Sequence, residues 1–79
     1  MTEAQIYAAL NEIFTEVFML DDVQLTAATT ANDITGWDSF KQIEIIMAVE
    51  ERLGIKLQTR EIDNLKCVGD LVGVIARKA

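Results

Sequence analysis

Apolar residues recur every three or four positions in three stretches of the chain, the spacing that places side chains on one face of a helix. The first stretch covers residues 3–18, and Thr2 just ahead of it and Gln5 within it have the spacing of an N-terminal capping box. The spacing therefore predicts an amphipathic helix over residues 3–18. Its apolar face consists of Ile6, Leu10, Ile13, Phe14 and Val17.

The second periodic stretch begins at Asp38 or Ser39 and runs to about Leu53, where Gly54 supplies a C-terminal stop. It carries two apolar stripes. The first contains Ile45, Val49 and Leu53 with Ile46 beside them, and the second contains Phe40, Ile43 and Met47, bordered by Glu44, Glu50 and Glu51. One helix faces only one core comfortably. The second stripe is therefore either an exposed docking strip or a face buried by another neighbour, and the pattern alone favours neither.

The C-terminal part contains a connector, a short turn and the third periodic stretch. After the connector 55–58, Thr59 is expected to cap a short helical turn that extends through Asn64. A last helix is expected from about Cys67 to Arg77. Its inward-facing residues are Val68, Leu71, Val72 and Ile75. Within it, Gly69 and Gly73 lower helicity by roughly 1 kcal/mol each relative to alanine and permit close packing against a neighbour.

Residues 19–37, which include Asp21-Asp22, lack a helical period and indicate a long loop. A loop of this length is usually functional or held down by its own apolar residues. The candidates are Val23, Leu25, Ile34 and Trp37. No β period recurs, so the predicted fold is all-α: a small four-helix bundle of three main helices and one short helix, forming a single domain over residues 1–79.

Composition excludes several kinds of chemistry. The chain has 79 residues, no histidine and one cysteine, Cys67. Ser-His, Cys-His and His-metal arrangements are therefore absent, and Cys67 has no partner for a disulfide or a metal-binding pair. We expect no metal site and no catalysis by so short a chain. The longest apolar run is only 45–49 and no secretory signal precedes it, so we expect a cytoplasmic protein without membrane insertion.

The net charge of −6 is distributed unevenly. Residues 1–51 carry ten acidic groups and one basic group, a sum of −9, whereas residues 52–79 carry six basic and three acidic groups, a sum of +3. Phosphate backbones repel an acidic surface, so nucleic acid is not an expected partner. The acidic residues either steer the domain toward basic patches on other proteins or keep a small monomer in solution.

Ser39 stands at the start of the predicted second helix, in the stretch Gly36-Trp37-Asp38-Ser39-Phe40. Ser39 and Gln42 have capping-box spacing, but Asp38 can also cap this helix. If Asp38 caps, the hydroxyl of Ser39 points outward, where the helix dipole and free N–H groups favour an attached phosphate. Ser39 is therefore either a structural cap or an acceptor that another enzyme modifies.

This stretch, followed by Ile43-Glu44-Ile45-Ile46-Met47-Ala48-Val49-Glu50-Glu51-Arg52-Leu53-Gly54-Ile55, resembles the acyl carrier protein family. The similarity is most specific over residues 36–57, and the remainder agrees in the order of its elements. The resemblance implies that Ser39 carries 4′-phosphopantetheine, installed from coenzyme A by a phosphopantetheinyl transferase. The thiol of that group would hold acyl groups as thioesters, so the chain is expected to be a carrier and not an enzyme.

The resemblance also implies a partner-binding surface on the second helix. Carried over by position, its residues are Asp38, Phe40, Ile43, Glu44, Met47 and Glu51. Its acidic members would orient basic patches on the transferase, on an acyl-loading ligase or acyltransferase and on synthase enzymes, and its apolar members would anchor them. The Gly-Trp-Asp-Ser form resembles carriers of specialised pathways and D-alanyl carrier proteins. Phe40 and Lys41 depart from the commonest pattern of the family, and Lys41 indicates a partner set different from the usual synthase.

Two alternatives remain open from the sequence. An aminoacyl, D-alanyl or peptidyl carrier would share the fold and cofactor and differ only in its cargo. An unmodified helical adaptor would bind a partner through Phe40, Ile43 and Met47, and Ser39 would then only cap the helix.

Overall fold

The computed structural model describes residues 1–20 and 23–78, and these contain four α-helices, one 3-10 helix and no β-strand. The elements in chain order are α1 (Glu3–Phe18), η1 (Ala31–Asp33), α2 (Ser39–Leu53), α3 (Thr59–Asp63) and α4 (Val68–Lys78). The predicted all-α fold, with three main helices, one short helix and a long connection between the first two, is confirmed.

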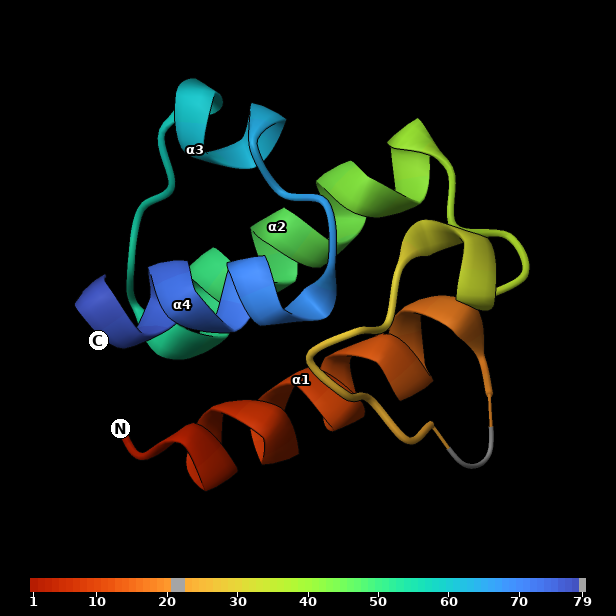
Figure 1. The fold of residues 1–79 in the computed structure, drawn as a ribbon, viewed down its shortest axis with the longest axis horizontal. Helices are drawn as coiled ribbons and strands as arrows, with labels where there is room; N and C mark the ends of the chain where they lie inside the picture. The colour runs from red at the N-terminus through yellow and green to blue at the C-terminus, as the bar shows by residue number, and fades with distance from the viewer. Residues whose placement is uncertain (21–22, 79) are drawn as a thin grey trace.

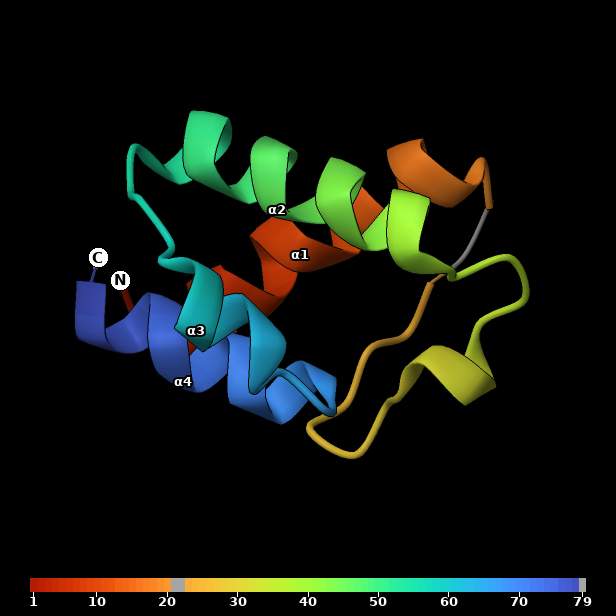
Figure 2. The ribbon, with the colours of Figure 1, turned by 90° about the horizontal axis from the view of Figure 1, so that it is seen from above.

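Helix α1 packs against both α2 and α4. Figure 1 shows that α2 and α4 run in the direction opposite to α1. Helix α3 lies on the side of the bundle away from α1 (Figure 1). In both views the two chain termini lie close together at one end of the molecule, and the first turn of α2 lies at the other end (Figures 1 and 2).

The three long helices and the connector after α2 share one apolar core. Its buried residues are Ile6, Leu10, Ile13 and Phe14 from α1, Ile45, Ile46 and Val49 from α2, Ile55 and Leu57 from the connector, and Val68, Leu71, Val72, Val74 and Ile75 from α4. The predicted inward faces of α1 and α4 are confirmed, although Val17 is only partly buried and Val74 was not predicted to face inward.

The ends of α1 and α2 follow the capping chemistry of the sequence. The backbone N–H of Thr2 donates to Oε1 of Gln5 at 2.8 Å, and the N–H of Gln5 donates to Oγ1 of Thr2 at 3.2 Å, so the predicted capping box is present. Gly54 ends α2 in the left-handed region, with φ 66°, and its N–H donates to the carbonyl of Glu50 at 3.0 Å.

The start of α3 differs from the prediction. Gln58 occupies the N-cap position and Thr59 is the first helical residue, so the expected capping role of Thr59 is wrong. Glu61 explains why α3 begins at Thr59, because its Oε1 accepts a hydrogen bond from the N–H of Gln58 at 2.9 Å. Helix α3 ends at Asp63, one residue before the predicted Asn64. Helix α4 begins and ends one residue later than predicted.

The long connection before α2 is held to the core by its apolar residues, as predicted. These are Val23, Leu25, Ile34 and Trp37. The sequence did not predict η1, because this turn is built from local side-chain bonds and not from an apolar period. Oγ1 of Thr30 accepts from the N–H of Asn32 at 3.3 Å, and Oδ2 of Asp33 accepts from the N–H of Thr30 at 2.9 Å. Asp21 and Asp22 lie outside the described residues.

The same connection forms a backbone seam with the start of α4. The N–H of Val68 donates to the carbonyl of Thr29 at 2.8 Å, and the N–H of Gly69 donates to the carbonyl of Ala27 at 3.0 Å. A Cβ atom on Gly69 would lie 2.9 Å from that carbonyl oxygen, so glycine permits the predicted close approach. For Gly73 the prediction of close packing is wrong, because a Cβ there would meet nothing within 4 Å.

Candidate functional site

The N-terminus of α2 is capped by Asp38. Oδ1 of Asp38 accepts from the backbone N–H of Lys41 at 2.9 Å, and the carbonyl of Asp38 accepts from the N–H of Gln42 at 2.9 Å. Asp38, and not Ser39, therefore caps the helix, and Ser39 is the first helical residue.

Ser39 is exposed at this helix end. Among the described residues, its hydroxyl has no hydrogen-bond partner, and the backbone N–H groups of Ser39 and Phe40 have no acceptor. Unpaired N–H groups at the positive end of a helix dipole are a favourable environment for an anion. The site thus offers a free hydroxyl beside two free backbone donors.

Trp37 anchors the residues that precede Ser39, as the sequence predicted. Its ring meets that of Phe14 nearly edge-on, with centroids 5.1 Å apart and an interplanar angle of 83°, and lies 6.2 Å from that of Phe18. Its indole Nε1–H donates to Oε1 of Gln42 at 2.8 Å. Sequence reasoning missed this role of Gln42 and assigned the residue only to a capping box with Ser39.

Lys41 also fastens the first turn of α2 to α1. Its ammonium lies 3.4 Å from the carbonyl oxygen of Val17, in the last turn of α1, and 3.3 Å from Oε2 of Glu44. A cation at a helix C-terminus is stabilised by the dipole and by the unpaired carbonyl groups there. The contact with Val17 was not predicted, because no sequence spacing relates residues so far apart.

The second apolar stripe of α2 faces solvent. Phe40 is 78% exposed, Ile43 57% and Met47 62%. Of the two possibilities that the sequence left open for this stripe, the structure therefore shows an exposed strip and not a buried face. The acidic residues Asp38, Glu44 and Glu51 are exposed as well. Glu50 does not border the strip as expected. Its carboxylate is turned toward the connector and accepts from the N–H of Leu57 at 2.9 Å.

A cavity of about 500 Å³ opens beside Ser39, between α2 and the segment that joins α3 to α4. Its apolar lining residues are Trp37, Ile43, Ile62, Leu65, Val68 and Leu71. Polar side chains of Asp38, Gln42, Asp63 and Lys66 also border it, and the half-buried Cys67 forms part of its wall. This cavity could not be predicted from the sequence, because its walls come from separate elements that meet only in the folded chain.

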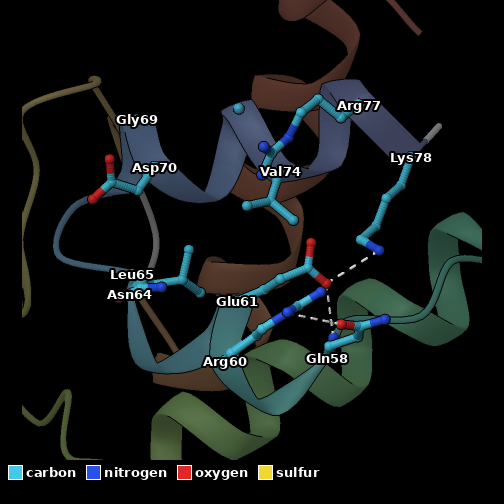
Figure 3. Close-up of a pocket in the computed structure, with 11 residues that line it drawn as sticks. Gln58, Arg60, Glu61, Asn64, Leu65, Gly69, Asp70, Val74, Arg77 and Lys78 are labelled. Atoms are coloured by element: carbon cyan, nitrogen blue, oxygen red, sulfur yellow. Dashed lines mark hydrogen bonds and ion pairs between the residues drawn. The ribbon is translucent and has the colours of Figure 1, made fainter.

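A second hollow of about 820 Å³ lies between α3 and α4 and has a polar lining (Figure 3). The carboxylate of Glu61 bridges its two sides, accepting from the N–H of Gln58 at 2.9 Å and lying 3.1 Å from Nζ of Lys78. The backbone bond from Gln58, followed by Lys78, lowers the pKa of Glu61 below its ordinary value despite opposing desolvation. This ion pair ties the short helix to the last one.

No group of three or more metal-ligating side chains is found in the described ranges. None of the helices in these ranges is long and apolar enough to cross a membrane.

The sequence profile of the family described as "Phosphopantetheine attachment site" matches residues 8–75, most of the chain. An acyl carrier protein of Acidothermus cellulolyticus is 32% identical over 76 residues, which cover 96% of this chain and 90% of that protein. The chain belongs to the acyl carrier protein family.

Other acyl carrier proteins agree with this chain in sequence and in fold. The holo acyl carrier protein of Geobacter metallireducens, solved by NMR, is 40% identical and superposes with a TM-score of 0.86 over 91% of this chain and 83% of that one. A meromycolate extension acyl carrier protein of Mycolicibacterium smegmatis is 30% identical over 96% of this chain and 77% of that protein.

As an acyl carrier protein, the chain is a carrier of 4′-phosphopantetheine and not an enzyme. The residues at the start of α2 fit this group. A phosphodiester needs an accessible hydroxyl for attachment and gains from unpaired N–H donors, and the first turn of α2 provides both. The cavity beside it has a mainly apolar wall, which suits the hydrocarbon part of a cargo.

Proposed function

We propose that Ser39 is the residue to which 4′-phosphopantetheine is attached. The observation that carries this proposal is the capping of α2 by Asp38, which leaves the hydroxyl of Ser39 exposed and without a partner. A phosphate on that oxygen would lie beside the free N–H groups of Ser39 and Phe40, at the positive end of the helix dipole. When bound, the group supplies a thiol that holds acyl cargo as a thioester.

The exposed face of α2 is the proposed docking surface for partner enzymes. Its residues are Asp38, Phe40, Ile43, Glu44, Met47 and Glu51. Three large apolar side chains in contact with water provide the anchor, and the acidic residues provide attraction to basic patches. The proposed partners are a phosphopantetheinyl transferase, an acyl-loading ligase or acyltransferase, and downstream synthase enzymes. The 79 residues would act as one carrier domain, as a cytoplasmic monomer.

Phe40 of this surface and the neighbouring Lys41 support a specialised pathway over general fatty acid synthesis. Phe40 follows the serine and is largely exposed, so a partner must accommodate an aromatic ring there. Lys41 forms an ion pair with Glu44, which reduces the negative charge of the face. The cargo is proposed to be an acyl group rather than an aminoacyl group, because the relatives are named as acyl carriers.

Intact-mass spectrometry after incubation with coenzyme A and a broad-specificity phosphopantetheinyl transferase tests the attachment site. The wild-type chain is expected to gain one phosphopantetheine, and Ser39→Ala is expected to gain none. Modification of Ser39→Ala would refute the assignment of this residue. If the wild-type chain stays unmodified under conditions that convert a control carrier, the result would support the alternative function of an unmodified helical adaptor.

A further inference from the structure

The residues on either side of Ser39 are held together by a side-chain bond that helix formation does not require. The indole N–H of Trp37 and Oε1 of Gln42 are 2.8 Å apart, and this bond spans the capped end of α2 on which Ser39 stands. The indole ring is in turn packed against Phe14 and Phe18 of α1. Trp37 thus helps to fix the position of Ser39 relative to the core, in addition to the helix that carries Ser39.

We propose that Gln42 and Trp37 are positioning residues for the modification of Ser39. This inference rests on the proposed function of Ser39. In that reaction Oγ of Ser39 forms a bond to the phosphorus on the pantetheine side of coenzyme A. The phosphoanhydride bond breaks, the hydroxyl proton passes to a base of the transferase, and 3′,5′-ADP leaves. Neither Gln42 nor Trp37 takes part in these bond changes.

Their contribution follows from where the loop and the helix join. Gly36 has φ 91° and no side chain, so the residues between it and α2 need an external restraint. Phe14 and Phe18 hold the ring of Trp37, and the bond to Gln42 links this fixed ring to α2. Without the bond, the first turn of α2 can shift relative to Trp37 and carry the cap residue Asp38 with it. A displacement of about 1 Å at a reacting group can cost on the order of a hundredfold in rate. Phe40, Ile43 and Met47 take no part in this bond, so the apolar anchor of the docking surface is expected to be retained.

The test compares modification kinetics of two variants at one position. Gln42→Met removes the acceptor and retains a side chain of similar length, whereas Gln42→Glu retains an acceptor oxygen. We expect Gln42→Met to lower kcat for transfer roughly tenfold with KM within about twofold, and Gln42→Glu to stay within about threefold of wild type. The chain has one tryptophan, so a single indole N–H resonance reports directly whether the bond is present.

Val74→Ala is the matched control for a general loss of stability. Val74 is buried in α4, at 7% exposure, and borders the hollow between α3 and α4 instead of the cavity beside Ser39. This variant is expected to unfold at a lower temperature and to keep the wild-type kcat. Trp37→Phe removes the donor and keeps an aromatic ring, so it is expected to lower kcat as Gln42→Met does. It provides the same test if Gln42→Met does not fold.

Three results would overturn the proposal while Ser39→Ala still showed the attachment site to be correct. These are an unchanged kcat in the variants without the bond, an equal loss of kcat in Val74→Ala, or an indole resonance that Gln42→Met does not move. Failure of the wild-type chain to accept phosphopantetheine would overturn the proposed function itself, and this inference with it.

Discussion

The carboxylate of Asp38 caps α2 through the backbone N–H of Lys41, with Oδ1 and N 2.9 Å apart. Ser39, between these two residues, is thereby released from the structural role that its position would otherwise give it. A helix needs one side-chain acceptor at its start, and this helix has an aspartate for that purpose. The serine hydroxyl remains available for chemistry.

This division of roles predicts different stabilities for two neighbouring substitutions. Asp38→Ala is expected to lower the free energy of unfolding of the unmodified chain by about 1 kcal/mol, because it removes the cap. Ser39→Ala is expected to change it by less than about 0.5 kcal/mol, because its hydroxyl has no partner. Urea unfolding monitored by circular dichroism measures both. Asp38→Asn keeps an acceptor oxygen and serves as the control, and an equal loss in Ser39→Ala would contradict the assignment of the cap.

The two glycines of α4 are expected to respond in opposite directions to alanine. At Gly73 the added methyl group meets open space, so Gly73→Ala is expected to stabilise the fold by about 0.5–1 kcal/mol through helix propensity. At Gly69 the methyl group would lie 2.9 Å from the carbonyl oxygen of Ala27. Overpacking costs about 1–3 kcal/mol and exceeds the propensity gain, so Gly69→Ala is expected to be destabilising. Thermal unfolding of both variants measures whether each substitution raises or lowers the stability. A stabilised Gly69→Ala would mean that the backbone at Ala27 moves aside at little cost in free energy.

Electrostatic docking predicts a slower modification when acidic charge is reversed on α2. The double change Glu44→Lys and Glu51→Lys is expected to reduce kcat/KM for the transferase at least tenfold at low salt, because steering of this kind is worth about 10–1,000-fold in association rate. The difference is expected to shrink as salt increases, since screening acts on exposed charges. The helical circular dichroism is expected to stay unchanged.

A charge-matched control separates this local effect from the net charge of the chain. Glu3→Lys with Glu12→Lys changes the total charge by the same amount on α1, where both residues are exposed. Glu12 also pairs with Arg52 of α2 at 3.0 Å, so the thermal unfolding of this variant is measured alongside its modification rate. This variant is expected to retain most of the wild-type rate. Equal slowing in both double variants would indicate that net charge, and not the face of α2, governs the encounter.

The ion pair in the hollow between α3 and α4 predicts a dependence of stability on pH. Because the pKa of Glu61 is lowered in the folded chain, its carboxylate stabilises the fold above its unfolded pKa, and this contribution is lost as pH falls through the folded pKa. Glu61→Gln is therefore expected to unfold at a lower temperature than wild type at pH 7. The gap is expected to close below the ordinary carboxyl pKa of about 4.3. A gap that stays constant down to pH 3 would contradict this account.

The sequence predicted features that depend on local spacing. The capping box of Thr2 and Gln5, the stop at Gly54 and the buried faces of α1 and α4 all follow from residues within a few positions of one another. It left open which of Asp38 and Ser39 caps α2, because both residue types can do so. The sequence predicted a close approach at Gly69 but not its partner, Ala27. That partner and the contact of Lys41 with Val17 join distant parts of the chain, so only the folded structure reveals them.

The placement of the two chain termini has a practical consequence for experiments on this protein. Both ends leave the bundle on the side opposite the first turn of α2 (Figures 1 and 2). An affinity tag or a fluorescent reporter fused to either end therefore starts at the end of the bundle that is farther from Ser39. A surface-immobilised sample tethered by its tail would present its reactive end to solution.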